Sequence, residues 1–163
     1  MRASLLILSV ACSAAQAGAI FLGAYPDGVL VVDEATQRII DKFPTQAGLP
    51  TGMRISYDRK KIYVTSGDRS GVSVIDIASH KVINHFVLNS GNRQLRFSSG
   101  VAPDPQDKIL YAVVTEVVKQ VDRFEIGKPQ YAVIDLAQQK IVRTVPIPEE
   151  DEDANTNTGD GFG

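Results

Sequence analysis

A segment that occurs three times constrains this chain of 163 residues more than any other feature of its sequence. Each copy has an apolar run rich in Val and Ile, then an Asp, a short turn, a Lys or Arg, and a second apolar run. The copies occupy residues 28–40, 71–83 and 130–142, and their aspartates are Asp33, Asp76 and Asp135. The first two aspartates are 43 residues apart and the last two are 59 apart. Such self-similarity indicates a fold built from stacked units.

A second repeated segment lies between the copies of the first. Residues 52–65 match residues 100–113 at an offset of 48 residues without a gap, and residues 20–22 look like a shortened copy of residues 62–64. The two segments together predict four short strands per unit, each of four to seven residues and bounded by Gly, Pro, Asp or Ser. No stretch keeps a helical spacing of apolar residues over three turns.

These patterns predict an all-β fold made of β-propeller blades, each with four antiparallel strands. We expect the repeat region to occupy residues 18–148 and to hold about two and three-quarter blades, which is an incomplete ring. It would contain the last three strands of one blade, followed by two complete blades.

Sixteen additional residues separate Asp76 from Asp135 when the spacing is compared with that of the preceding pair. About five of them lie within residues 90–99, and the rest lie around residues 119–128, between the second and third strands of the last unit. Insertions in repeat proteins map to loops, often on the binding face. We therefore expect any functional surface in two irregular insertions, residues 90–99 and 116–129.

The first 17 residues have the order of features found in a cleaved secretory signal. Arg2 is followed by an apolar run over residues 5–10, which is too short to span a bilayer, and then by Ala15-Gln16-Ala17. A buried first strand is the alternative. We expect residues 1–17 to be removed and the protein to be secreted or periplasmic. Lipid anchoring through Cys12, which has Ser9 where lipoproteins usually carry Leu, is the less favoured route to the same location.

The polar residues of the repeat invite a catalytic interpretation, but a structural one is favoured. Asp33, Asp76 and Asp135 precede the turn of each unit, where a carboxylate accepts hydrogen bonds from backbone N–H groups of its own turn. Equivalent positions also fall in different blades, far from one another. His80 and His85 are the only histidines, and no Cys or carboxylate pattern completes a metal site around them.

The other recurring residues have structural interpretations as well. We expect Gly28 and Gly71, at the start of a strand, to supply a positive φ in a tight turn. Tyr63 and Tyr111 are expected to be blade-packing aromatic residues. The sequence thus predicts no catalytic, cofactor-binding or metal-binding residues, and no cofactor.

The segment 149–163 is acidic and polar, and we expect a solvated tail or an inter-blade loop. Calcium binding is the alternative, but an EF-hand loop requires Gly at its sixth position and Glu at its twelfth. Counting from Asp151 or Asp153 puts Thr156 or Thr158 sixth, and no Glu follows. The net charge of −2 gives no electrostatic reason to expect a nucleic-acid partner, and no transmembrane segment is expected.

Residues 46–66 carry a resemblance to the YVTN family of β-propeller repeats. The stretch has Pro50-x-Gly52, a strand, a turn at Asp58, and Tyr63-Val-Thr, with Ser66 where the family has Asn and Arg59 where it has Gly. The resemblance covers residues 20–148. It implies a seven-bladed, exported protein of bacteria or archaea, in a family that includes redox-enzyme subunits, surface-layer or adhesive modules and relatives of lactonase propellers. No haem-attachment or copper-ligand motif is present here to support a redox role.

Seven blades of this size need about 300 residues. A partial ring leaves sheet edges and blade faces open, which favours aggregation. We therefore expect either a fragment of a longer protein or copies that associate to close the ring. The function expected is that of a non-enzymatic extracytoplasmic binding or scaffold module for an unidentified protein or surface. The alternative is the remnant of a propeller enzyme subunit, redox or lactonase-like, whose active residues are absent from this chain.

Overall fold

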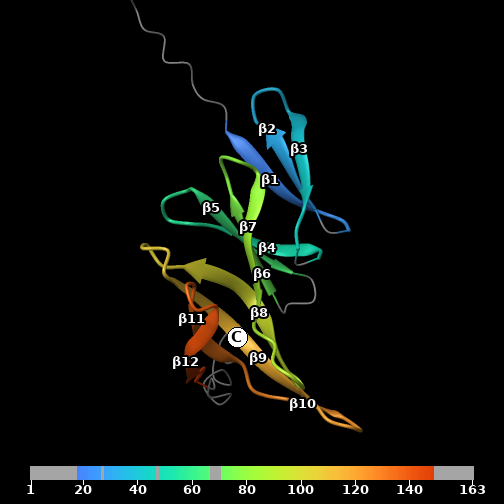
Figure 1. Ribbon diagram of the computed structural model, residues 1–163, viewed down its shortest axis with the longest axis vertical. Helices are drawn as coiled ribbons and strands as arrows, with labels where there is room; N and C mark the ends of the chain where they lie inside the picture. The colour runs from blue at the N-terminus through green and yellow to red at the C-terminus, as the bar shows by residue number, and fades with distance from the viewer. Residues whose placement is uncertain (1–17, 27, 47, 67–70, 149–163) are drawn as a thin grey trace, which may run out of the picture.

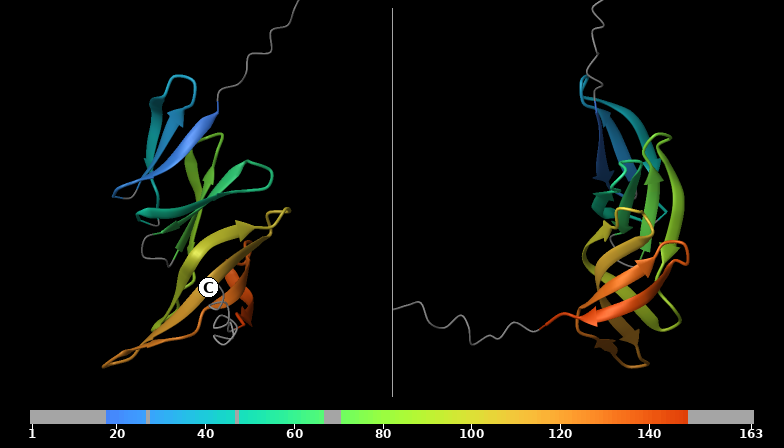
Figure 2. Two further views of the ribbon diagram at one scale, coloured as in Figure 1. Left: turned by 180° about the vertical axis from the view of Figure 1, so that it is seen from behind. Right: turned by 90° about the vertical axis from the view of Figure 1, so that its left-hand side faces the viewer.

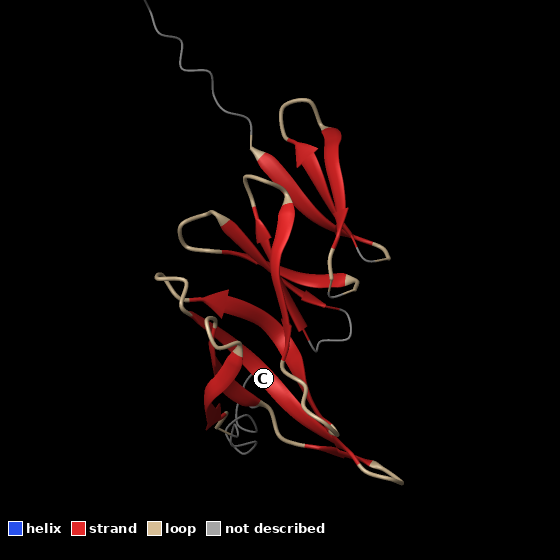
Figure 3. Cartoon of the chain, in the orientation of Figure 1, coloured by secondary structure: helices blue, strands red, loops and turns tan. Residues whose placement is uncertain are grey.

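The computed structural model describes residues 18–26, 28–46, 48–66 and 71–148, and the regular elements there are all β-strands (Figure 3). No helix in these ranges is long and apolar enough to cross a membrane. The strands form three antiparallel sheets that follow one another along the chain and stack face to face (Figures 1 and 2). The predicted all-β, blade-type fold is therefore confirmed.

The first two sheets match the sequence prediction strand for strand. The first contains β1 (Ala19–Ala24), β2 (Gly28–Asp33) and β3 (Arg38–Pro44), which are the last three strands of a blade. The second is a complete blade in the order of the chain: β4 (Pro50–Ile55), β5 (Lys61–Ser66), β6 (Gly71–Asp76) and β7 (Lys81–Val87).

The third sheet is larger than predicted, because it has five strands instead of four. It contains β8 (Arg93–Pro103), β9 (Ile109–Lys119), β10 (Phe124–Ile126), β11 (Gln130–Asp135) and β12 (Lys140–Pro146). β8 and β9 have 11 residues each, beyond the predicted limit of seven. Much of the two insertions predicted to be irregular is strand, namely residues 93–99, 116–119 and 124–126. No turn-forming residue interrupts the stretch from Val113 to Val118, so its ladder with β8 continues.

The recurring aspartates serve the turns that follow β2, β6 and β11, as predicted. The side chain of Asp33 accepts the N–H of Thr36 at 2.7 Å, that of Asp76 accepts the N–H of Ser79 at 2.8 Å, and that of Asp135 accepts the N–H of Gln138 at 2.7 Å. Hydrogen bonds from the hydroxyl groups and N–H groups of Thr36 and Ser79 lower the pKa values of Asp33 and Asp76.

The prediction for Gly28 and Gly71 is wrong, because neither has a positive φ. They open β2 and β6 next to a neighbouring strand, and a Cβ added at Gly71 would lie 3.2 Å from the carbonyl oxygen of Phe86. Close approach, rather than backbone conformation, is therefore what requires glycine at Gly71.

Positive φ angles of 55° to 58° fall instead on five residues that are not glycine. These residues lie in the turns after the first and third strands of the blades: Gln37, Arg59, His80, Asp107 and Gln139. Two of them, Gln37 and Gln139, donate their N–H to the carbonyl oxygen of the aspartate four residues earlier, at 2.8 and 2.7 Å.

Two apolar layers between the sheets form the core. Val29, Ile62, Val64 and Ile75 are buried between the first and second sheets. The layer between the second and third sheets is larger and contains Tyr63, Val72, Val74, Phe86, Phe97, Val101, Leu110, Ala112, Val114, Ala132 and Ile134. Tyr63 is 2% exposed, so its predicted packing role is confirmed, whereas Tyr111 is 49% exposed on the outer face of the third sheet.

We predict that Leu110→Ala lowers the free energy of unfolding by about 3 kcal/mol, because the side chain is fully buried between two sheets. The matched control is Val142→Ala, at a side chain that is 52% exposed, where a change within about 0.5 kcal/mol is expected. Urea unfolding followed by circular dichroism measures both values. Equal losses would contradict the assignment of the core.

A second prediction concerns acid stability and Asp104, whose carboxylate accepts the N–H groups of Ile109, Lys108 and Gln106 at 2.6, 2.7 and 3.2 Å. These hydrogen bonds, that from Ile109 foremost, lower the pKa of Asp104. A carboxyl group with a lowered pKa stabilises the fold fully above its ordinary pKa of about 3.9 and loses that contribution as the pH falls through its folded value.

Between about pH 6 and about pH 3, the native chain should therefore lose more stability than the Asp104→Asn variant. Urea midpoints at a series of pH values measure the two declines. Parallel curves would show that ionised Asp104 does not stabilise the turn.

Candidate functional site

The two predicted insertions lie side by side because the first pairs with the end of β9, whose residues 116–119 belong to the second. Residues 93–97 of β8 pair with residues 114–118, from Arg93 opposite Val118 to Phe97 opposite Val114. On the other edge of β9, β10 pairs with residues 117–119. The result is a three-stranded projection, called here the arm and defined as residues 93–97 and 115–126, which extends beyond the blade (Figure 1).

Local hydrogen bonds fix the outer end of the arm. In the segment that precedes β8, Ser90 and Arg93 exchange N–H···O bonds of 2.9 Å around Gly91, which has a φ of 58°. The side chain of Asn92 donates to the carbonyl oxygen of Lys119 at 3.2 Å, and Lys119 returns its N–H to Asn92 at 2.8 Å. At the tip, the N–H of Gln120 binds the carbonyl oxygen of Arg123 at 2.8 Å. Strand pairing and these turns give the arm a defined shape.

Large apolar side chains of the arm are left in solvent. Val121 is fully exposed, Phe124 is 62% exposed and Ile126 is 74% exposed. Charged residues flank them, and Arg123 forms an ion pair with Glu125 at 2.9 Å. Apolar side chains gathered on a projecting element, with charges around them, are typical of a surface that binds another molecule.

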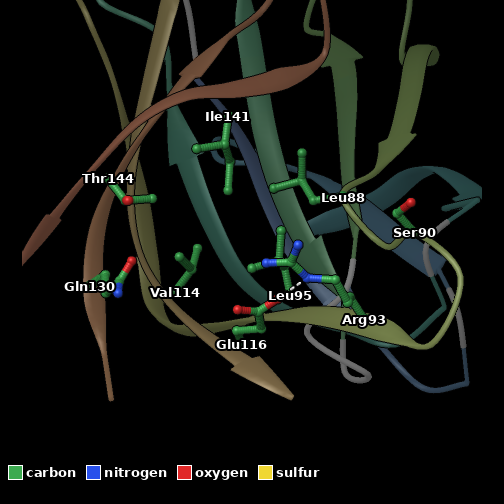
Figure 4. A pocket seen from close by; sticks show the side chains of 9 residues that line it. All are labelled: Leu88, Ser90, Arg93, Leu95, Val114, Glu116, Gln130, Ile141 and Thr144. Carbon is green, nitrogen blue, oxygen red and sulfur yellow. Dashed lines mark hydrogen bonds and ion pairs between the residues drawn. The ribbon is translucent and has the colours of Figure 1, made fainter. Parts of the chain in front are cut away.

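A cavity of about 340 Å³ lies where the root of the arm meets the space between the second and third sheets (Figure 4). Its apolar part contains Leu88, Leu95, Val114 and Ile141, and its polar part contains Ser90, Arg93, Glu116, Gln130 and Thr144. Arg93 donates through its Nε to Glu116, and this ion pair raises the pKa of the guanidinium. The cavity combines apolar walls with a few polar groups, as ligand sites generally do.

A second hollow of about 450 Å³ lies at the opposite ends of the strands, between the same two sheets. Its polar groups already bind one another: the side chains of Tyr63 and Lys61 both donate to the carboxylate of Asp107. Burial and the hydrogen bond to Asp107 raise the pKa of Tyr63, so the phenol stays protonated and donates. These groups link two blades and already satisfy one another's hydrogen bonds.

The structure does not bring the polar residues of the sequence analysis together. Asp33, Asp76 and Asp135 lie in three different sheets, as expected for a repeated position. His80 approaches Asp41 of the first sheet with its Nδ1 at 3.0 Å, and Nδ1 of His85 lies 3.3 Å from the hydroxyl of Ser73. No cluster of three or more His, Cys, Asp or Glu that could hold a metal ion occurs in the described part of the chain.

Sequence reasoning missed Arg93 and Glu116, which are 23 residues apart and meet only through the pairing of β8 with β9. The β-branched residues at 113–115 and 117–118, with no Gly, Pro, Asn or Asp among them, were the signal that could have predicted the longer strand. The predicted signal segment 1–17 and the acidic segment 149–163 lie outside the described residues.

No family model and no curated protein matches this sequence. The fold is similar to solved β-propellers. Against the β-propeller domain of Cps50 (Swd1) from Myceliophteria thermophila the TM-score is 0.62 at 15% identity, with 81% of this chain and 41% of that one covered. Against the WD40 domain of Toxoplasma gondii coronin the TM-score is 0.53 at 14% identity, with 80% and 31% covered.

A protein of unknown function from Desulfotomaculum acetoxidans gives a TM-score of 0.54 at 16% identity, covering 80% of this chain and 37% of that one. The chain therefore spans about two fifths or less of the length of these three structures. At such identities the likeness establishes the β-propeller fold alone.

We predict that the arm can be shortened without unfolding the blade. Replacing residues 116–127 by Asn-Gly leaves β9 and β11 paired from Ile109–Asp135 to Val114–Gln130. The free energy of unfolding should stay within about 1 kcal/mol of the native value, because stability depends weakly on loop length. Urea unfolding measures it. Loss of cooperative unfolding would show that the arm is part of the core structure.

Proposed function

We propose that this protein is a non-enzymatic, extracytoplasmic binding module that holds a protein partner with its arm and the cavity at the root of the arm. The observation that carries the proposal is the exposure of Val121, Phe124 and Ile126 on an element with fixed strand pairing. The stacked blades act as the rigid support for this surface.

The chemistry of the arm favours a protein partner. Aromatic and aliphatic side chains within a rim of mixed charge resemble the apolar centre and polar rim of protein interfaces. Because strand pairing already fixes the backbone of the arm, little conformational entropy is lost when a partner binds. The adjacent cavity of about 340 Å³ would accept an apolar side chain of the partner against Leu95, Val114 and Ile141.

An extracytoplasmic location is supported by the signal-like order of residues 1–17. The remaining sequence contains no Cys, because Cys12 is the only one in the chain. A mature protein without thiols suits an oxidising compartment.

We predict that a photo-crosslinking amino acid at Phe124 forms a covalent adduct with one protein in cells that export the chain. The matched control carries the same group at Tyr57, which is 76% exposed on the turn between β4 and β5. The adduct should disappear when Ile126→Ser is added, because the substitution removes apolar contact area next to the crosslinker. Electrophoresis and mass spectrometry identify the product.

The same adducts from both positions would contradict a binding surface on the arm. Turnover of a lactone or of a redox dye by the purified chain would contradict the non-enzymatic part of the proposal.

A further inference from the structure

One face of each sheet repeats the same apolar positions. Val29, Val31 and Phe43 of the first sheet face the second sheet, and Val72, Val74 and Phe86 occupy the same positions of the repeat and face the third. The valines and Phe86 are at most 5% exposed. The third copy of this face consists of Tyr131, Val133 and Val145, and here Tyr131 is 51% and Val145 is 36% exposed.

The opposing face of each sheet repeats as well. Ile62 and Val64 of β5 are buried against the first sheet, and Leu110 and Ala112 of β9 are buried against the second. The matching residues of the first sheet are Ile20 and Leu22, which are 44% and 47% exposed. The two open faces of the chain therefore carry the repeated apolar residues of the two halves of an interface that already occurs twice within it, although the first sheet has no counterpart of β4 and β8.

A cross-blade contact between side chains repeats with this interface. His80, in the turn after β6, meets Asp41 of β3 at 3.0 Å, and Gln139, in the turn after β11, donates to Asn84 of β7 at 3.1 Å. Asp41 and Asn84 both stand three residues after the Lys or Arg that starts the last strand of the blade.

The next members of this series are Gln37 in the first sheet and Arg143 in the third, one at each open face. Gln37 has a φ of 55°, as His80 does, so its side chain leaves the backbone from the same conformation. Within the described residues, neither side chain makes a hydrogen bond or an ion pair. The Arg143 guanidinium donates and the Gln37 carbonyl oxygen accepts, so the pair is chemically matched.

We propose that a second copy of this chain binds head to tail, with its first sheet against the third sheet of the first copy and its Gln37 opposite Arg143. Two copies bring together six sheets, within the range of four to eight blades that closes a propeller. The same junction formed twice then closes the ring, as a head-to-tail contact does when its rotation permits. Residues 149–163, which are mostly acidic and polar, do not match an apolar face.

The test uses two variants of the full chain, purified after export, each with one blocked face. Leu22→Arg places a charge on the first sheet, and Tyr131→Arg places one on the third; both side chains are about half exposed, so folding should be retained, which circular dichroism verifies. Sedimentation velocity should give the native chain twice the mass of one copy and each variant the mass of a single copy.

Mixing the two variants distinguishes this geometry from others. One blocked face on each chain leaves one intact junction, so the mixture should form dimers that neither variant forms alone. If the mixture stays monomeric, or if one variant still dimerises alone, head-to-tail association is wrong. A native chain that is monomeric at all concentrations also overturns it, and would leave other occupants, such as residues 1–17 or further blades, to cover the faces.

The proposed polar pair has its own test. Gln37→Glu should tighten the dimer by creating an ion pair with Arg143, and Gln37→Lys should weaken it; adding Arg143→Glu to Gln37→Lys should restore dimerisation. Tyr57→Arg, away from both faces, is the control and should change nothing. Failure of the double variant to recover would place Gln37 away from Arg143. None of these positions is in the arm, so the outcome is independent of partner binding there.

Discussion

The fold depends on apolar sheets that must be covered on both faces. In the middle sheet this requirement is met: β6 is buried from Gly71 to Ile75, because neighbouring sheets lie on either side. A strand that is covered on both faces cannot alternate between apolar and charged residues. Accordingly, the five consecutive buried residues of β6 are all small or β-branched. In repeat architectures, contacts between neighbouring units supply much of the stability. The structure therefore depends on the interfaces between blades more than on any single blade.

The sequence predicted what is local and repeated. The strands of the first two sheets and the turn role of Asp33, Asp76 and Asp135 follow from residue types within a few positions of one another. The arm was not predicted because it depends on the pairing of residues 93–97 with residues 114–118, which are far apart in the chain. The roles of Gly28 and Gly71 were misassigned because a glycine can serve close approach as well as positive φ.

The third blade differs from the second in the places where function is proposed. The arm and its cavity exist because β8 and β9 continue past the point at which their counterparts β4 and β5 end. The recurring aspartates, by contrast, keep the same structural role in each blade. The surface proposed to bind a partner thus lies where the third blade departs from the repeat. The recurring polar residues are easier to find in the sequence, but they do not indicate this surface.

The side-chain links between neighbouring blades lie toward one end of the strands. The contacts His80–Asp41, Gln139–Asn84 and Tyr63–Asp107 all lie at the ends of the strands where the Asp-containing turns are found. The opposite ends carry the arm and the cavity between the second and third sheets. Neighbouring blades are thus linked through side chains at one end of the strands and through the chain itself at the other, where residues 45–49 and 88–92 connect one blade to the next. A molecule that occupies the cavity beside the arm would therefore contact the segment that connects the second blade to the third, through Leu88 and Ser90.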